Sequence, residues 1–268
     1  MHANLTNANL QSANLHEANL TDADLTDADL TGANLAHANL TGANLTGANL
    51  TNANLTRVNL TNANLLHTNF TNARLVKANL THANLTNANM EGANITKAYL
   101  AGTSLEGANL TRANLAGADL TRVYLANANL TRATLADANL AIANLTDANL
   151  THANLTGADL ASANLASADL TIANLTGANL EITYITNANL TNANLTNANL
   201  TNANLTNANL WKTNLTGTNH REANLTNAMY IKSFSIQDDN NSVKRWCACM
   251  YGKKQNQRIR FRAPIAKA

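Results

Sequence analysis

The stretch Thr186–Leu210 reads TNANL-TNANL-TNANL-TNANL-TNANL, five consecutive copies of one five-residue unit. The same unit extends outward with small changes, because every fifth residue from Leu5 to Tyr230 is large and an alanine almost always lies two places before it. There are 46 such central positions, and leucine occupies all except Phe70, Met90, Ile95, Ile185, His220 and Tyr230. One repeat therefore governs residues 3 to about 230, and its period decides the architecture.

A period of five fits neither a single helix nor a single strand. At about 100° per residue, five residues turn a helix by about 140°, so the leucines cannot form one apolar stripe. Along one strand, an odd step would place successive leucines on alternate faces. The chain is therefore predicted to turn a corner every five residues.

Within one unit, alanine and leucine are two residues apart, so an extended segment points both side chains to the same, inner side. The Asn or Asp between them is predicted to point into water, and the remaining two residues carry turn chemistry. Four corners close a coil of roughly 20 residues, and stacked coils lie about 4.8 Å apart. The 46 units then give eleven and a half coils and a rod on the order of 55 Å long.

With this motif, written A(D/N)LXX, the chain resembles the pentapeptide-repeat family over residues 3 to about 230. The resemblance implies an all-β fold, a right-handed quadrilateral parallel β-helix with about 20 residues per coil. Some members of that family resemble DNA in shape and charge and bind type II topoisomerases, whereas others are adaptors or regulators. Members also often dimerise through their C-terminal coils. The fold alone does not settle the function.

Charge divides the chain into a repeat domain, residues 1–230, and a C-terminal cap with a basic, flexible tail, residues 231–268. The repeat domain holds nine Lys and Arg against fourteen Asp and Glu, and the tail holds nine against two. No apolar run is long enough to span a membrane, and no secretory signal is visible, so a cytoplasmic location is predicted.

Residues 20 apart are expected to lie above one another, so outward positions form columns. One such column is a basic stripe on which aligned cations could meet phosphates, the alternative being an ordinary solvated face. Its members are His37, Arg57, Lys77 and Lys97, with Arg74 beside Lys77. A second basic column holds Arg112, Arg132 and His152.

Another pair of columns is apolar where the repeat is otherwise polar. Arg and Tyr are common at interface hot spots, so this edge is the candidate partner-binding surface, although scattered apolar surface residues are also normal. The candidate residues are Arg122, Tyr124, Ile142, Ile182 and Tyr184.

The repeat weakens after Leu210, where Trp211, Tyr230 and Phe234 are expected to form an end cap or a dimer contact. Catalysis has no evident site, because the histidines are not brought together with a nucleophile and a convex rod offers no pocket. Cys247 and Cys249 form a single pair, which is weak evidence for a metal site, and no cofactor is implied.

Three functions from different classes remain, and the leading one is a non-catalytic scaffold that presents side-chain columns to a protein partner. The second is a DNA mimic that binds a type II topoisomerase such as gyrase, which requires a strongly negative rod. The third, direct nucleic-acid binding through the basic stripe and tail, is the least favoured. The C-terminal coils are also a candidate homodimer contact.

Overall fold

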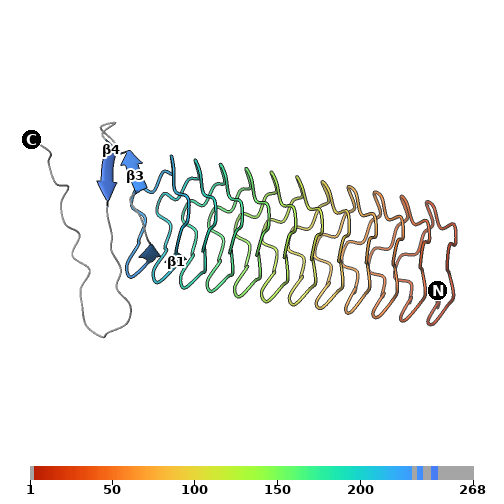
Figure 1. The fold of residues 1–268 in the computed structure, drawn as a ribbon. Helices are drawn as coiled ribbons and strands as arrows, with labels where there is room; N and C mark the ends of the chain where they lie inside the picture. The colour runs from red at the N-terminus through yellow and green to blue at the C-terminus, as the bar shows by residue number, and fades with distance from the viewer. Residues whose placement is uncertain (1–2, 231–233, 238–242, 247–268) are drawn as a thin grey trace, which may run out of the picture.

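The computed structural model describes residues 3–230, 234–237 and 243–246. From residue 3 to residue 230 the chain winds into stacked coils that together form a rod (Figure 1). Parallel β-bridges join each outward residue to the residue 20 positions later, from Asn4↔Asp24 to Asn204↔Asn224. The predicted coil of 20 residues, with four sides and four corners, is therefore confirmed.

Regular strands are few, which differs from a conventional sheet. The described strands are β1 (Asn209–Leu210), β2 (Met229–Tyr230), β3 (Phe234–Gln237) and β4 (Val243–Trp246). Strands β1 and β2 pair in parallel, and β3 and β4 pair antiparallel. Elsewhere a turn every five residues leaves room for one bridging residue on each side of a coil. The described part of the chain contains no helix, and hence none that could span a membrane.

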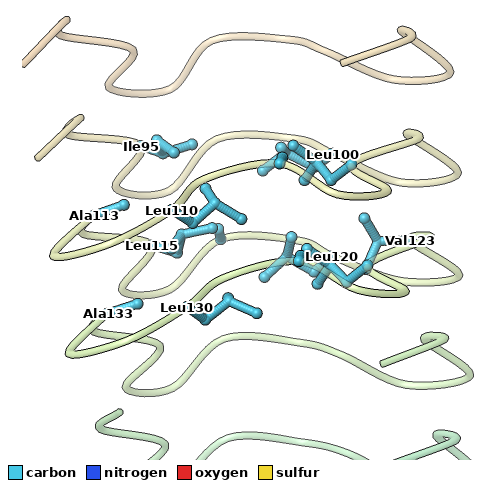
Figure 2. Packing of buried hydrophobic residues seen from close by; sticks show 14 of the residues in the cluster. Ile95, Leu100, Leu110, Ala113, Leu115, Leu120, Val123, Leu130 and Ala133 are labelled. Atoms are coloured by element: carbon cyan, nitrogen blue, oxygen red, sulfur yellow. The ribbon is translucent and has the colours of Figure 1, made fainter. Parts of the chain in front are cut away.

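The interior of the rod is a dry stack of leucine and alanine. From Leu25 to Leu205 the central residues are 0–2% exposed, and the alanines two places before them are equally buried. Figure 2 shows Leu110 and Leu130, and likewise Ala113 and Ala133, pointing inward from successive coils. The predicted inward orientation of both positions is confirmed.

The outward asparagines are not simply solvated, so the prediction that they point into water was incomplete. Asn44 is half-buried, and its Oδ1 accepts hydrogen bonds from the backbone N–H (3.2 Å) and the hydroxyl (2.7 Å) of Thr46. Its Nδ2 donates to Thr26 Oγ1 of the preceding coil at 2.8 Å. This arrangement recurs along the rod, so Asn and Thr together link the coils.

Threonine also replaces the buried alanine at a few positions. Thr68, Thr103 and Thr183 are 0% exposed. Each hydroxyl donates to the carbonyl of the leucine 23 residues earlier, at 2.7–2.9 Å. Because their polar atoms are satisfied, these substitutions preserve the packed interior.

Candidate interaction surfaces

Each corner of the rod has one conformation regardless of its sequence. The carbonyl of the central residue accepts the N–H of the residue three places later, as Leu140 does from Ala143. The third residue of this turn has a positive φ at all 45 corners, from Asn7 to Asn227. Values are 53–61° at non-glycine residues and 64–69° at glycine. Turns of this kind favour Gly or Asn at that position, because other L-residues are strained there.

The candidate partner-binding residues meet at one corner and the side that follows it; we call Arg122, Tyr124, Ile142, Ile182 and Tyr184 the interaction edge. Successive bridges Tyr124↔Asn144, Asn144↔Asn164 and Asn164↔Tyr184 align the two tyrosines on the same side. Both isoleucines occupy the positive-φ corner position, with φ of 61° and 57°. The four apolar side chains of the edge are each 47–53% exposed.

Three exposed apolar side chains were not singled out from the sequence. Tyr99 (55% exposed) lies on the side that leads into the same corner column, one coil before Arg122. Ile172 (45%) occupies the diagonally opposite corner, and Met229 (43%) lies in β2. Tyr99 and Met229 replace the outward Asn, so a search for departures from the repeat could have found these two, whereas Ile172 occupies the variable fifth position and keeps the pattern.

The two basic columns lie at the two ends of one side of the coil. Arg74 is on that side, bridged to Asn54 and Asn94, and its Nε donates to Thr56 Oγ1 at 3.1 Å. The chain passes through one corner at residue 72, crosses this side at residue 74 and reaches the next corner at residue 77. The column that includes Lys77 and the column that includes Arg132 therefore flank the same surface, the Arg74 side.

An acidic segment lies on other sides of the rod, near its N-terminal end. The Thr26 hydroxyl and backbone N–H donate to Asp24 and hold the pKa of that carboxyl below its usual range. The Gln11 side chain, followed by Thr31, lowers the pKa of Asp29 in the same way. Both carboxylates therefore stay ionised well below neutral pH.

The last coil, like the first, is less enclosed than the coils between them. Leu215, His220 and Leu225 are half-buried and line a shallow pocket with Leu210 and Thr218. Trp211 is 41% exposed on this coil. Tyr230 ends β2 and Phe234 begins β3, and their side chains are outside the described residues. The proposed cap or dimer contact thus remains a prediction.

No catalytic or metal-binding cluster is found in the described ranges. His16 and His37 approach each other, with ring centroids 5.5 Å apart, but no nucleophile accompanies them. No group of three or more His, Cys, Asp or Glu side chains in residues 3–230, 234–237 and 243–246 could hold a metal ion. Cys247, Cys249 and the basic tail lie outside these residues.

Comparison with protein families matches this chain to the model described as pentapeptide repeats. Eight copies of the repeat match, over residues 1–36, 38–75, 73–112, 108–141, 143–181 and 183–219. The matched segments span nearly the whole rod and end within the last coil. A search of the curated proteins found no match.

Several solved structures are similar to this chain. HetL, a pentapeptide repeat protein involved in heterocyst differentiation regulation from the cyanobacterium Nostoc sp. strain PCC 7120, is 30% identical, with 85% of this chain and 92% of that chain covered and a TM-score of 0.47. QnrB1, a plasmid-mediated fluoroquinolone resistance protein, is 16% identical, with 68% and 89% covered and a TM-score of 0.39. Rfr23 from the cyanobacterium Cyanothece 51142 is 35% identical, with 49% and 90% covered and a TM-score of 0.19.

Proposed function

The chain belongs to the pentapeptide-repeat family, and on that premise we propose that it is a non-catalytic scaffold whose interaction edge binds a protein partner. In this proposal the rod winds right-handedly, as the family resemblance implies, and holds the edge in a fixed geometry. The coils beyond Tyr184 consist largely of identical repeats and serve as a spacer.

The observation that carries this proposal is the conformation of Ile142 and Ile182. A β-branched residue with φ near +60° is an outlier, and a left-handed conformation costs an L-residue roughly 1–2 kcal/mol. Both side chains are about half exposed, so burial in the rod returns little of that cost. Asn or Gly would suit the fold better, which supports a role for these isoleucines outside it.

The tyrosines of the edge have a similar local cost. At most positions an Asn or Asp side chain accepts the backbone N–H of the residue two places later, as Asn144 does from Thr146. Tyr124 and Tyr184 supply no such acceptor, and among the described hydrogen bonds none is donated by the backbone N–H of Ala126 or Thr186. Losing one such bond costs about 0.5–1.5 kcal/mol. Binding a partner would offset this loss.

The partner that fits this edge is a protein with a narrow apolar strip. Tyr124 and Tyr184 are three coils apart, which places them about 14 Å from each other at the usual strand spacing. Arg122 at one end suits a carboxylate on the partner. Aromatic and Arg side chains commonly dominate the energy of such interfaces.

The DNA-mimic alternative has weaker support in the charge distribution. Binding a type II topoisomerase as a mimic needs negative charge along the rod. Residues 3–230 instead hold nine Lys and Arg against fourteen Asp and Glu, an excess of only five negative charges over the whole rod. A gyrase supercoiling assay tests this alternative, and inhibition at stoichiometric protein would favour it over the scaffold.

The scaffold proposal is tested by restoring the consensus at the edge. A variant with Tyr124→Asn, Ile142→Asn, Ile182→Asn and Tyr184→Asn should fold normally but fail to retain the main partner in affinity capture from a native extract. Ile172→Asn is the matched control, because it makes the same change at the opposite corner and should retain that partner. If the edge variant retains the partner, these residues do not form the binding surface.

A further inference from the structure

Seven consecutive coils each place a basic side chain beside the Arg74 side. The positions first follow one corner and then cross to the other, so they form an oblique row over the surface. The row consists of His37, Arg57, Lys77 and Lys97 on the first corner, Arg112, Arg132 and His152 on the second, and Arg74 between them. We call its six Lys and Arg residues the basic row.

Charge is strongly divided around the rod. Over residues 3–230, the Arg74 side and its two corners hold seven of nine Lys and Arg residues but three of fourteen Asp and Glu residues. Those three carboxylates are Glu17, which precedes the row, and Glu91 and Asp137 within it. The other three sides are strongly acidic, with eleven carboxylates against Arg122 and Arg221. The surface potential therefore changes sign across the rod.

Apart from Arg74, whose Nε donates to Thr56 Oγ1, the fold itself does not account for the cations of the basic row. Within the described residues the recorded ion pairs are His16–Glu17 and Arg221–Glu222, so the row forms no salt bridge there. All of its members except Arg74 occupy the positive-φ corner position, with φ of 55–59°. Asn or Gly would be less strained there and would leave the rod intact. A ligand outside the rod is the simplest reason for a cation in each coil.

We propose that the basic row binds the phosphate backbone of duplex nucleic acid. The row places six charges on five consecutive coils, about 19 Å over its four coil steps, and this length meets about six phosphates of one strand. Four of its six members are Arg, which pairs well with phosphate. A single strand would call for aromatic stacking platforms, and none of the described exposed aromatics lies on this side within these seven coils.

This surface is separate from the interaction edge. The side of the coil that carries Tyr124 is opposite the side that carries Arg74, because two corners separate these two sides in either direction. One rod could therefore hold a duplex on one side and a protein on the other. The contacts are with phosphate rather than with base edges, so binding is independent of sequence.

The experiment measures binding of the full chain to a 20-base-pair DNA duplex by fluorescence anisotropy over a range of salt concentrations. Six phosphate contacts predict that log K falls with log salt at a slope of up to about −5. The row variant carries Arg57→Asn, Lys77→Asn, Lys97→Asn, Arg112→Asn and Arg132→Asn, and should lose most of that slope. At 50 mM salt it should bind at least about 100-fold more weakly.

Two further proteins complete the design. Lys212→Asn makes the same change at the same kind of corner (φ 56°), four coils beyond Arg132, and should leave the slope unchanged. A tail variant with Lys253→Gln, Lys254→Gln, Arg258→Gln, Arg260→Gln and Arg262→Gln separates the row from the basic tail. An unchanged or higher melting temperature of the row variant shows that it is folded.

The expected pattern is loss of binding in the row variant and near-wild-type binding in Lys212→Asn and the tail variant. Loss in the tail variant with retention in the row variant would overturn the proposal. So would the absence of duplex binding by the wild type at 50 mM salt. Tighter binding to single strands, or to vesicles of anionic lipid, than to the duplex would also reject it.

Discussion

At the scale of single residues, the backbone conformation of the corner position determines which side chains fit there without strain. The third residue of every turn has a positive φ, yet isoleucine occupies that position at residues 142, 172 and 182. A β-branched side chain is the least suited to that region, whereas Asn enters it readily. Stability and surface chemistry therefore make opposing demands at these three corners.

This conflict leads to a stability prediction. Ile142→Asn and Ile182→Asn should each raise the free energy of unfolding by about 1 kcal/mol, because the strained φ is relieved and little burial is lost. Urea denaturation measures the change, and Ile142→Val, which keeps the β-branch, should differ little from the wild type. If the Asn variants were less stable, the isoleucines would be packing favourably on the rod after all.

The left-handed corner could have been inferred from the sequence, since Asn, Gly and Asp are common there. The sequence predicts that the preceding Thr is a turn residue and the following Ala a core residue, and the structure confirms both. The αL conformation itself was not predicted, because Arg, Lys, His and Ile at the same position obscured the preference. The backbone strain at residues such as Lys97 and Ile182 becomes evident only from their positive φ values in the structure.

At the scale of the coil, the interior and the outward column differ sharply in what they tolerate. Leu130→Asp should destabilise the protein by more than about 4 kcal/mol, because it places an unpaired charge where the wild-type side chain is 0% exposed. Asn129→Asp should change stability by about 0.5 kcal/mol or less. Asp retains the oxygen that accepts both the N–H and the hydroxyl of Thr131. Thermal denaturation compares the two variants, and equal shifts would contradict the assignment of inside and outside.

The period of five was enough to predict the 20-residue coil, the inward leucines and the columns. Two features of the coil could not be predicted from this period. The Asn ladder depends on a threonine 18 residues earlier, as in Asn64 to Thr46 at 2.9 Å, and so requires the exact stacking register. The shared side of the two basic columns likewise becomes visible once the corners at residues 72 and 77 are placed on one coil.

At the scale of the whole molecule, the open last coil makes self-association the main question. We expect a dimer through residues of about 211–236, because half-buried leucines such as Leu215 and Leu225 remain to be covered there. Sedimentation velocity at micromolar concentration should show a dimer for the wild type. The variant Trp211→Ala, Tyr230→Ala, Phe234→Ala should sediment as a monomer.

A matched variant, Tyr124→Ala with Tyr184→Ala, removes exposed aromatics far from that end and should remain dimeric. A monomeric wild type would mean that residues 211–236 act as a cap alone. Dissociation of both variants to monomers would instead locate the contact along the rod rather than at its end.

Because the coil has four sides of five residues, the side on which a residue lies depends on its position within a 20-residue period; we call this position its phase. Gain or loss of 20 residues preserves the phase, so Tyr124 and Tyr184 would stay aligned while their separation changed by one coil. Gain or loss of five residues between them would stack equally well and expose no leucine. Yet it would rotate everything downstream by one side and move the two tyrosines onto adjacent faces. Such a mutation would leave folding intact but would disrupt binding of the partner. Among related chains, differences in length should therefore favour multiples of four repeats.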